Sequence, residues 1–128
     1  MASIIRFPLI LALQLCMVCS IGFASSPVVH IISGMPKNSE PLSIHSKVSG
    51  NSIAVPTLLP GNEYQWRAEV NDIYYCTTIW GRQFAAWHAY ELARDAGHAT
   101  IFSLVNEDGF FLSWDKSSWK KIAYWETD

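Results

Sequence analysis

Residues 63–70 read EYQWRAEV, and this stretch decides the fold class because two kinds of side chain alternate along it. Every second residue, from Tyr64 to Val70, is apolar, and every residue between them, from Glu63 to Glu69, is charged or polar. An alternation with a period of two is typical of an antiparallel strand that buries one face. The sequence LPGN at residues 59–62 predicts a turn just before this strand.

Comparable short runs lie on both sides of this strand, separated by residues that favour turns. Residues 42–48 alternate in the same way, and the sequence SGN at residues 49–51 predicts a turn after them. The predicted strands are residues 28–33, 42–48, 53–58, 63–70, 73–80, 100–105, 110–114 and 120–125. About eight short strands at a spacing of about 8 to 12 residues are typical of an all-β protein, either a small antiparallel β-sandwich or a small barrel.

Residues 84–96 (FAAWHAYELARDA) fit two different structures. They are rich in strong helix formers, and Phe84, Trp87, His88 and Leu92 have helical spacing. The alternation of a strand also fits the first half of the segment. Local propensity alone favours the helix.

The first 24 residues have the pattern of a secretory signal peptide. A positive charge at Arg6 precedes an apolar stretch at residues 7–17, and small residues follow it up to Ala24. Polar residues interrupt the stretch, and a spanning helix needs about 20 predominantly apolar residues. We therefore expect cleavage between Ala24 and Ser25, no stable membrane insertion, and one secreted, extracellular domain at residues 25–128.

The charge of the chain argues against two classes of partner. Beyond Ala24 there are eight basic and eleven acidic residues, which gives a net charge of −3 with neutral histidines. Non-specific binding to nucleic acid depends on Lys and Arg side chains that neutralise phosphates. We therefore expect no nucleic-acid partner, and the same excess of acidic residues argues against anionic membrane surfaces.

No set of catalytic residues is recognisable in the sequence. The four histidines do not have the spacing of any known metal or hydrolase motif. They are His30, His45, His88 and His98. Two of them could converge in the fold as an acid–base pair, as a secreted ribonuclease requires, but nothing in the sequence selects such a pair. Glu107 and Asp108, just before Gly109, predict a turn rather than a pair of glycosidase carboxylates. We expect no enzyme activity, no metal and no cofactor.

Six tryptophans are many for a domain of this size, and they support two interpretations. Indole rings fill the core of a small sandwich, and most tryptophans are largely buried. A row of exposed indoles can instead stack on sugar rings, and Trp114, Trp119 and Trp125 are candidate sugar-stacking residues. A secreted carbohydrate-binding module is therefore the alternative function.

Several short motifs follow one another in a characteristic order. They are VHI with His30, LSIHSK with His45, Pro60-Gly61 followed by Trp66, Cys76 with Trp80, Tyr90, Arg94-Asp95, and Glu107-Asp108-Gly109. In this order and spacing, the chain after residue 24 resembles the plant self-incompatibility proteins of the stigmatic S-protein type and the S-protein homologues. The resemblance implies a β-sandwich in which residues 84–90 form a strand, followed by a turn or a short helical piece.

The resemblance also has implications for function. The founding members of that family are female determinants that act as extracellular ligands on incompatible pollen through a cell-surface partner, and most homologues have no assigned role. We therefore expect a ligand-like protein that binds an unknown cell-surface or extracellular protein, without catalysis.

Cys76 is the only cysteine after residue 24, because Cys16 and Cys19 lie in the predicted leader. The family typically has four cysteines in two disulfides. Here Ser46 stands at one of those positions, and residues 98–101, where two more are expected, contain none. The unpaired thiol of Cys76 is either buried in a monomer, which we favour because free cysteines are commonly buried, or the link of a covalent dimer. Loss of a disulfide predicts a domain less stable than its four-cysteine relatives.

Overall fold

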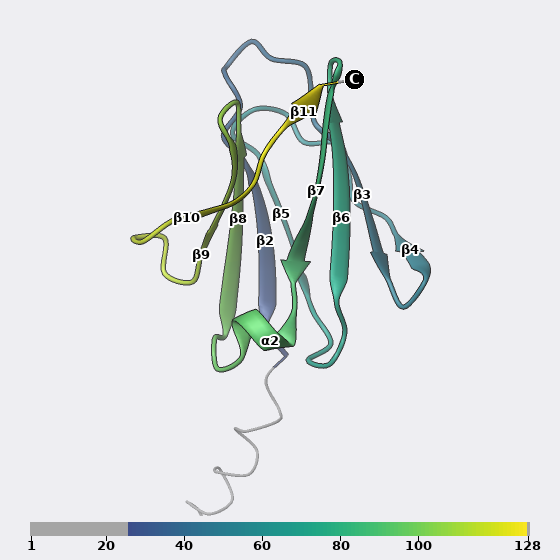
Figure 1. Ribbon diagram of the computed structural model, residues 1–128, viewed down its shortest axis with the longest axis vertical. Helices are drawn as coiled ribbons and strands as arrows, with labels where there is room; N and C mark the ends of the chain where they lie inside the picture. The colour runs from purple at the N-terminus through teal and green to yellow at the C-terminus, as the bar shows by residue number, and fades with distance from the viewer. Residues whose placement is uncertain (1–25, 128) are drawn as a thin grey trace, which may run out of the picture.

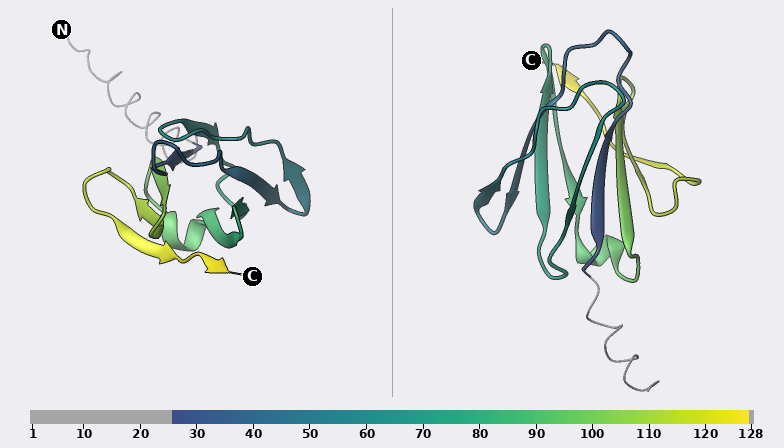
Figure 2. Two further views of the ribbon diagram at one scale, coloured as in Figure 1. Left: turned by 90° about the horizontal axis from the view of Figure 1, so that it is seen from above. Right: turned by 180° about the vertical axis from the view of Figure 1, so that it is seen from behind.

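The computed structural model describes residues 26–127, so the predicted leader and its cleavage point between Ala24 and Ser25 lie outside the described residues. Within this range ten strands form two five-stranded sheets that face each other (Figure 1, Figure 2). The helix of the described residues, α2 (Leu92–Asp95), lies at the end of the sandwich that is lowest in Figure 1. The predicted β-sandwich is confirmed, and the barrel is excluded because the strands form two separate sheets.

Each sheet combines strands from distant parts of the chain. The first sheet has the order β10 (Lys120–Ala123), β9 (Gly109–Ser113), β8 (Thr100–Asn106), β2 (Val28–Ser33), β5 (Glu63–Arg67). The second sheet has the order β11 (Glu126–Thr127), β7 (Gln83–Tyr90), β6 (Tyr74–Trp80), β3 (Ser43–Val48), β4 (Asn51–Ile53).

One strand pair departs from the expected antiparallel arrangement. β2 is parallel to β8, with Val28 beside Thr100, whereas the other strand pairs are antiparallel. Parallel neighbours need a long crossover connection. Here most of the domain, including the four longest strands of the second sheet and β5, lies between β2 and β8 in the chain.

The alternation along the strands builds the core between the two sheets. Side chains of the first sheet that point inward are fully buried at Val29, Ile31, Ile101 and Val105. Each such side chain contributes about 1.5–3 kcal/mol to folding by leaving water. The second sheet adds Trp87, whose indole N–H donates to Ser103 Oγ of β8 at 3.1 Å. This hydrogen bond ties the two sheets together inside the core.

β5 confirms the alternation of the EYQWRAEV stretch. Tyr64 and Trp66 pack against the core, whereas the alternate side chains of the strand are exposed. The strand ends at Arg67 rather than at Val70. Ala68 comes next, and its N–H donates to the carbonyl of Pro27 at 2.8 Å. Pro27 has no N–H that could donate a hydrogen bond back to the carbonyl of Ala68, so the ladder stops at this point.

The strand predicted for residues 53–58 is wrong. β4 ends at Ile53, and beyond it Leu58 forms only an isolated bridge, with Leu42. Pro56 has no N–H for a ladder and therefore interrupts a strand here. The segment instead carries the chain from the second sheet back to β5 of the first.

The strand predicted for residues 120–125 is confirmed for residues 120–123 and wrong beyond them, because the chain leaves the first sheet after Ala123. β10 pairs with β9 of the first sheet up to Ala123. β11 then pairs with β7 of the second sheet, with Glu126 beside Phe84. In Figure 1 this crossing segment passes over the side of the sandwich, in yellow.

The helix that local propensity favours at residues 84–96 is wrong for the first half of that segment. Residues 83–90 form β7, and only the four-residue α2 after it is helical, as the resemblance implied. Ala85, Trp87 and Ala89 point into the core and are at most 5% exposed, whereas Phe84 is 43% exposed. Burial of one whole strand face outweighs differences in helix propensity of less than about 1 kcal/mol per residue.

Candidate functional site

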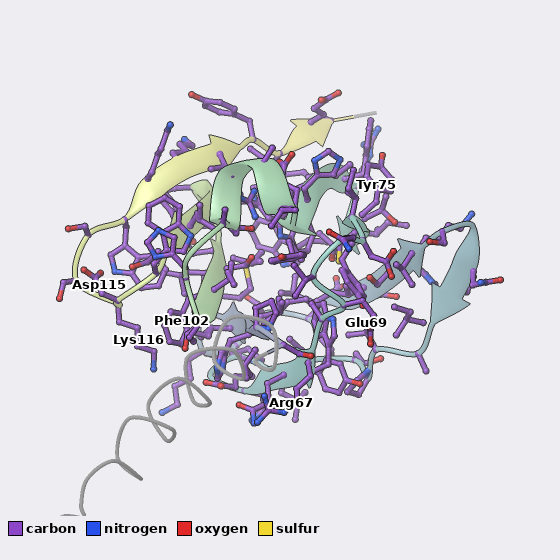
Figure 3. All side chains as sticks on the ribbon, turned by 90° about the horizontal axis from the view of Figure 1, so that it is seen from below. Arg67, Glu69, Tyr75, Phe102, Asp115 and Lys116 are labelled. Atoms are coloured by element: carbon purple, nitrogen blue, oxygen red, sulfur yellow. The ribbon has the colours of Figure 1, made fainter. Side chains whose placement is uncertain are left out.

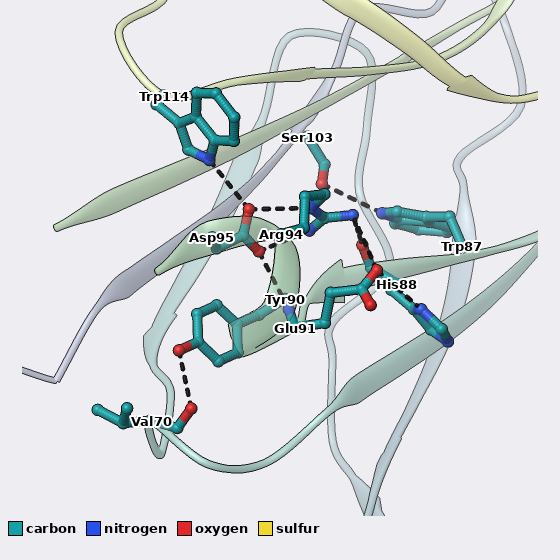
Figure 4. Close-up of polar contacts among 9 residues, drawn as sticks. All are labelled: Val70, Trp87, His88, Tyr90, Glu91, Arg94, Asp95, Ser103 and Trp114. Atoms are coloured by element: carbon teal, nitrogen blue, oxygen red, sulfur yellow. Dashed lines mark hydrogen bonds and ion pairs between the residues drawn. The ribbon is translucent and has the colours of Figure 1, made fainter. Parts of the chain in front are cut away.

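The end of β7 and α2 form a polar cluster around Asp95, which Figure 4 shows. The Asp95 carboxylate is buried and accepts hydrogen bonds from Arg94 Nε at 2.9 Å and Nη2 at 2.7 Å. It also accepts from the backbone N–H of Glu91 at 3.0 Å and from Trp114 Nε1 at 2.9 Å. These donors replace the water that a carboxylate loses on burial. Asp95 therefore fastens α2 to the loop that follows β9.

The Arg94 guanidinium connects this buried cluster with the surface. Its Nη1 donates to the carbonyl oxygen of His88 at 2.9 Å and lies 3.7 Å from Glu91 Oε1. His88 Nδ1 is 3.2 Å from the same carboxylate oxygen. Arg94 thus neutralises a buried carboxylate and also caps a backbone carbonyl at the edge of β7.

Tyr90 anchors the end of β7 just before α2. Its hydroxyl donates to the carbonyl of Val70 at 2.9 Å, and its ring is fully enclosed. Burial raises the pKa of Tyr90, and the charges of Asp95 and Tyr74 raise it further. Tyr90 is therefore a neutral hydrogen-bond donor at physiological pH. The family-motif residues Tyr90, Arg94 and Asp95 together hold one end of the sandwich.

A groove of about 350 Å³ lies next to this cluster, and we call it the β7 groove. Its lining comes from β6, β7, α2 and β10 and consists of Tyr75, Ala86, Trp87, His88, Glu91, Arg94 and Ile122. Tyr75 is 43% exposed, and its ring meets the His88 ring edge-on with centroids 5.8 Å apart. Aromatic and arginine side chains are enriched at protein–protein interfaces. The β7 groove is therefore the main candidate site.

A second aromatic group covers the outer face of the first sheet. His30 Nδ1 is 2.6 Å from Glu63 Oε2, and its ring packs on Phe102 with centroids 4.6 Å apart. Lys116 Nζ lies 5.0 Å from the centre of the Phe102 ring. Figure 3 shows Phe102 and Lys116 together, well away from Tyr75. The two aromatic groups thus belong to opposite outer faces of the sandwich.

Two of the family motifs form the turns that the sequence predicts. Pro60 and Gly61 form the turn before β5, and the Gly61 N–H donates to the carbonyl of Ser33 at 2.8 Å. Glu107 and Asp108 form the exposed turn between β8 and β9. Gly109 ends that turn with φ of +140°, a conformation that favours glycine.

The remaining motif residues lie on strands. His45 is exposed on β3. Trp66 packs between Tyr64 and Tyr74, with ring centroids 5.8 and 5.7 Å away. Trp80 packs on Trp125 at 5.6 Å. These indoles are half-buried and pack against the core between the sheets, whereas the imidazole of His45 is exposed.

Cys76 lies on β6 directly opposite Ser46 of β3. Both side chains are buried, and the thiol donates to Ser46 Oγ at 3.2 Å. Burial raises the pKa of Cys76 to about 11, an effect that the hydrogen bond with Ser46 only partly offsets. A buried neutral thiol is a poor nucleophile. Its position favours a thiol kept inside the monomer over a link between two chains.

The structure separates the three candidate sugar-stacking tryptophans. Trp114 and Trp119 are 39% and 37% exposed and line one pocket of about 170 Å³. Trp125 lies elsewhere: its ring packs on Phe110 at 4.8 Å, and its N–H donates to the carbonyl of Asn106 at 2.8 Å. Two indoles, rather than three, are therefore brought together at one surface.

Polar groups accompany the two indoles of this pocket. Asp115, Ser118 and Lys120 belong to its lining. The backbone N–H groups of Ser118 and Ser117, followed by the Ser113 hydroxyl, hold the pKa of the Asp115 carboxyl below its usual value. The pocket thus combines aromatic rings with a fixed negative charge and a lysine.

The fold does not assemble the histidines into one site. His45 and His88 share the outer face of the second sheet, but β6 lies between their strands. His30 lies on the first sheet, and His98 stacks on Trp114 with centroids 3.9 Å apart. Among residues 26–127, no group of three or more His, Cys, Asp and Glu side chains could hold a metal ion. The described part of the chain also has no helix long and apolar enough to cross a membrane.

Of the residues that line the β7 groove, the sequence analysis identifies Arg94 as a site candidate and misses the rest. Tyr75 and His88 meet because β6 pairs with β7 in one register, and Glu91 joins them because the chain then turns into α2. A register is set by the whole sheet and not by a short motif. The sequence signal that could have found Tyr75 is the alternation of a strand: if Cys76 points inward, its neighbour Tyr75 points outward.

The fold and its surfaces define a class of protein: a small β-sandwich in which residues 26–127 form no cluster that could hold a metal ion and in which aromatic side chains line two surface grooves. Comparison with known families is more specific. The family model described as plant self-incompatibility protein S1 matches residues 28–125. The chain therefore belongs to this family, and the resemblance found in the sequence is confirmed.

A solved structure supports the same fold. It represents the SPH (self-incompatibility protein homologue) proteins, described as a widespread family of small, highly stable, secreted proteins from plants. It matches with a TM-score of 0.55 and 10% sequence identity, covering 81% of this chain and 99% of that chain. At this identity the likeness supports the fold alone. No curated protein matches the chain significantly.

Proposed function

We propose that the protein is secreted and acts as a ligand that binds another protein at the cell surface or in the apoplast of a plant, without catalysis. The observation that carries this proposal is the family match over residues 28–125. The solved relative belongs to secreted plant proteins, which supports the extracellular location. Cell–cell recognition of the kind carried out by the founding members of the family, pollen rejection among them, is the corresponding biological role.

The surface of the domain is consistent with a protein partner. The second sheet presents Tyr75, Ile79 and Phe84 outward, each more than 40% exposed. Ile79 and Phe84 are direct neighbours across β6 and β7. Exposed apolar side chains that adjoin one another are typical of protein contact surfaces. The net negative charge beyond Ala24 supports neither nucleic acid nor anionic lipid as the partner.

Secretion is tested by expressing the full chain in plant cells. We expect the protein in the culture medium, with an N-terminus at Ser25, and as a monomer on non-reducing electrophoresis. Retention of the protein inside the cells would contradict the proposal.

Partner binding is tested with the protein collected from that medium. The labelled protein is titrated onto plant membranes, before and after mild protease treatment of the membranes. We expect saturable binding that unlabelled protein displaces and that protease treatment removes. Binding that does not saturate, or that survives protease treatment, would argue against a protein partner. A panel of nuclease and glycosidase substrates is the control for catalysis, and turnover would overturn the proposal.

The pocket between Trp114 and Trp119 favours one second candidate, the binding of carbohydrate. Two exposed indoles together with Asp115 and Lys120 provide stacking and hydrogen-bonding groups. The test is a titration of tryptophan fluorescence with plant cell-wall oligosaccharides, for wild type and Trp119→Ala. A saturable change in the wild type that Trp119→Ala abolishes would support this function. An unchanged spectrum up to about 10 mM sugar would exclude even weak binding.

A further inference from the structure

β7 is incompletely paired on its outer edge. β11 covers only Gln83 and Phe84, and no other strand in residues 26–127 pairs with that edge. Beyond β11, Ala86 to His88 line the β7 groove, and the register of β7 with β6 shifts between His88 and Tyr90. An unpaired strand edge presents N–H and C=O groups on which another chain can form a ladder.

The hydrogen bonds identify the backbone groups that face the groove. The carbonyl of His88 accepts from Arg94 and therefore points away from β6. In a strand, the N–H and C=O of one residue point to the same side, and alternate residues share a side. Phe84 and Ala86 thus share the side of His88, in agreement with the pairing of Phe84 with Glu126. Ala86 is the first position of this set beyond β11.

The other sheet edges are less suitable for strand addition. β4 has only three residues. β10 carries Lys120 and Lys121, and its register shifts before Ala123, in the middle of a four-residue strand, whereas β7 is regular from Gln83 to His88. Short strands, lysines and bulges all hinder the addition of another strand. At β5, the Tyr64 hydroxyl donates to the carbonyl of Ala54, which ties the loop after β4 to this edge.

The side chains of the β7 groove define what a bound segment needs. Tyr75, which is exposed, and the half-buried Ile122 provide apolar contacts along the lining. Asp95 pairs with Arg94, so its charge is compensated. The Glu91 carboxylate, 28% exposed, shares the same guanidinium at 3.7 Å, so one arginine faces two carboxylates and the α2 end of the groove has one negative charge in excess with His88 counted as neutral. A segment with apolar side chains and one basic residue near Glu91 is complementary to this arrangement.

We propose that an extended segment of the partner protein adds to the second sheet along residues 85–88 of β7, in line with β11 and before the register shift, with a basic side chain next to Glu91. This inference rests on the proposed function, because it specifies how the partner binds. The N–H and C=O of Ala86 and the N–H of His88, whose carbonyl is already bonded to Arg94, provide the main-chain hydrogen bonds that give such strand addition its affinity, and the flanking side-chain contacts give its specificity.

The first test uses peptides selected from a random library and needs no variant of the protein. Random nine-residue peptides displayed on phage are selected against the wild-type protein secreted from plant cells, and the best binder is synthesised. We expect apolar residues in alternate positions and a Lys or Arg at one end. Hydrogen exchange of the Ala86 and His88 amides should slow at least about tenfold when the peptide binds. Two methylated peptides are then compared, one N-methylated at its odd-numbered residues and one at its even-numbered residues. We expect only one of these two modifications to abolish binding.

The second test uses a pair of proline variants. Ala86→Pro removes the N–H at the open edge, where proline is tolerated because the N–H faces away from β6. Ala54→Pro is the matched control in the exposed segment after β4. We expect Ala86→Pro to weaken peptide and membrane binding at least about tenfold, and Ala54→Pro to leave both unchanged. Circular dichroism and thermal melting verify that both variants are folded.

Three outcomes would overturn the inference. The first is that no selected peptide protects the amides of β7, and the second is that wild type and Ala86→Pro bind the partner equally well. The third is that the wild-type protein forms a dimer that Ala86→Pro dissociates, because the edge would then bind a second copy of this chain. The proposed function fails separately, if the wild type has no saturable membrane binding. Partner binding that is unaffected by Ala86→Pro would leave the proposed function intact and refute only the use of this edge.

Discussion

The carboxylate of Asp95 is removed from water and depends entirely on protein donors. Arg94 supplies two of its hydrogen bonds, and Trp114 and the Glu91 backbone supply the others. Loss of one member of a buried ion pair costs more than the pair contributes, because the partner's charge remains without compensation. The Arg94-Asp95 motif is thus explained by the attachment of α2 to the sandwich, without any direct contact with a ligand.

We expect Asp95→Ala to lower the free energy of unfolding by about 3–5 kcal/mol. The reason is that the half-buried Arg94 guanidinium and the Trp114 N–H lose their acceptor. Urea denaturation at pH 7 measures the change. Asp108→Ala, in the exposed turn before β9, is the control and should change stability by less than about 0.5 kcal/mol. Equal stability of the two variants would show that the cluster is dispensable.

At Cys76, the thiol is removed from solvent and bonded only to Ser46. Burial disfavours the thiolate in the folded protein, whereas the unfolded chain ionises near the ordinary pKa of 9.0. The folded protein therefore retains a proton that the unfolded chain loses between about pH 9 and 11. The contribution of Cys76 to stability is complete below pH 9 and decreases as the pH rises toward 11.

We predict that raising the pH from 8 to 10 destabilises the wild type by about 1 kcal/mol more than Cys76→Ala. Both proteins share the titration of Tyr and Lys side chains, so their difference isolates the thiol. Urea denaturation at the two pH values under reducing conditions gives the comparison. Parallel pH dependence of the two proteins would show that the thiol ionises freely in the folded state.

Among the elements, the strands whose alternation is local were predictable from the sequence. β2 has the predicted bounds, and β5 has its predicted faces. β7 was not predictable from local propensity, because its Ala-rich sequence favours a helix and only the core contacts of Trp87 select a strand. The division into β10 and β11 was not predictable either, since no local signal at Ala123 marks the change of sheets.

The hairpin between β8 and β9 depends on a glycine for two separate reasons. Gly109 has φ of +140°, and a Cβ at this position would lie 2.7 Å from the carbonyl oxygen of Ala123 in β10. Gly61 also has a positive φ of +88°, but a Cβ there would meet nothing within 4 Å. Substitution of the two glycines therefore distinguishes the cost of steric contact from the cost of the backbone conformation.

We expect Gly109→Ala to be markedly more destabilising than Gly61→Ala. A positive φ alone costs an alanine about 1–2 kcal/mol, and Gly109→Ala adds a collision with backbone that has no flexible side chain to yield. Thermal melting of both variants tests this expectation. Equal melting temperatures would mean that β10 moves away without loss of stability.

For the molecule as a whole, alternation and turn residues spread over the chain predicted a sandwich or a small barrel, and the family resemblance selected the sandwich. Only part of the candidate site was predictable. The β7 groove instead requires the pairing of β6 with β7, the turn into α2 and the position of Ile122 on β10 of the other sheet. None of these relations is encoded in neighbouring residues, so Tyr75 and Glu91 could not be assigned from the sequence.

Cys76 is a free cysteine, and a disulfide at its position would act at the scale of the whole molecule, because a cross-link restricts the unfolded chain. Ser46 and Cys76 are opposite residues of β3 and β6, with their side chains in contact. Disulfides join cysteines whose Cα atoms are about 4.4–6.8 Å apart, and opposite residues of antiparallel strands lie about 4.5–5.5 Å apart. A thiol at position 46 would therefore be in reach of Cys76.

We predict that Ser46→Cys forms this disulfide and that its oxidised form is more stable than its reduced form by about 2–4 kcal/mol. The melting temperature should rise by at least about 8 °C for a domain of this size. Mass spectrometry of the unfolded protein, with a thiol reagent, verifies the cross-link. Wild type under the same oxidising conditions is the control. A verified disulfide without a higher melting temperature would contradict the prediction.

The parallel pairing of β2 with β8 has a consequence for how the chain folds as it is made. β2 is the first strand of the domain and β8 the seventh, so the centre of the first sheet cannot close until most of the chain has been synthesised. Pairing between such distant segments makes folding slow. During that interval the apolar β2 strand remains unpaired toward β8, and newly made chains need protection from aggregation before the sandwich closes.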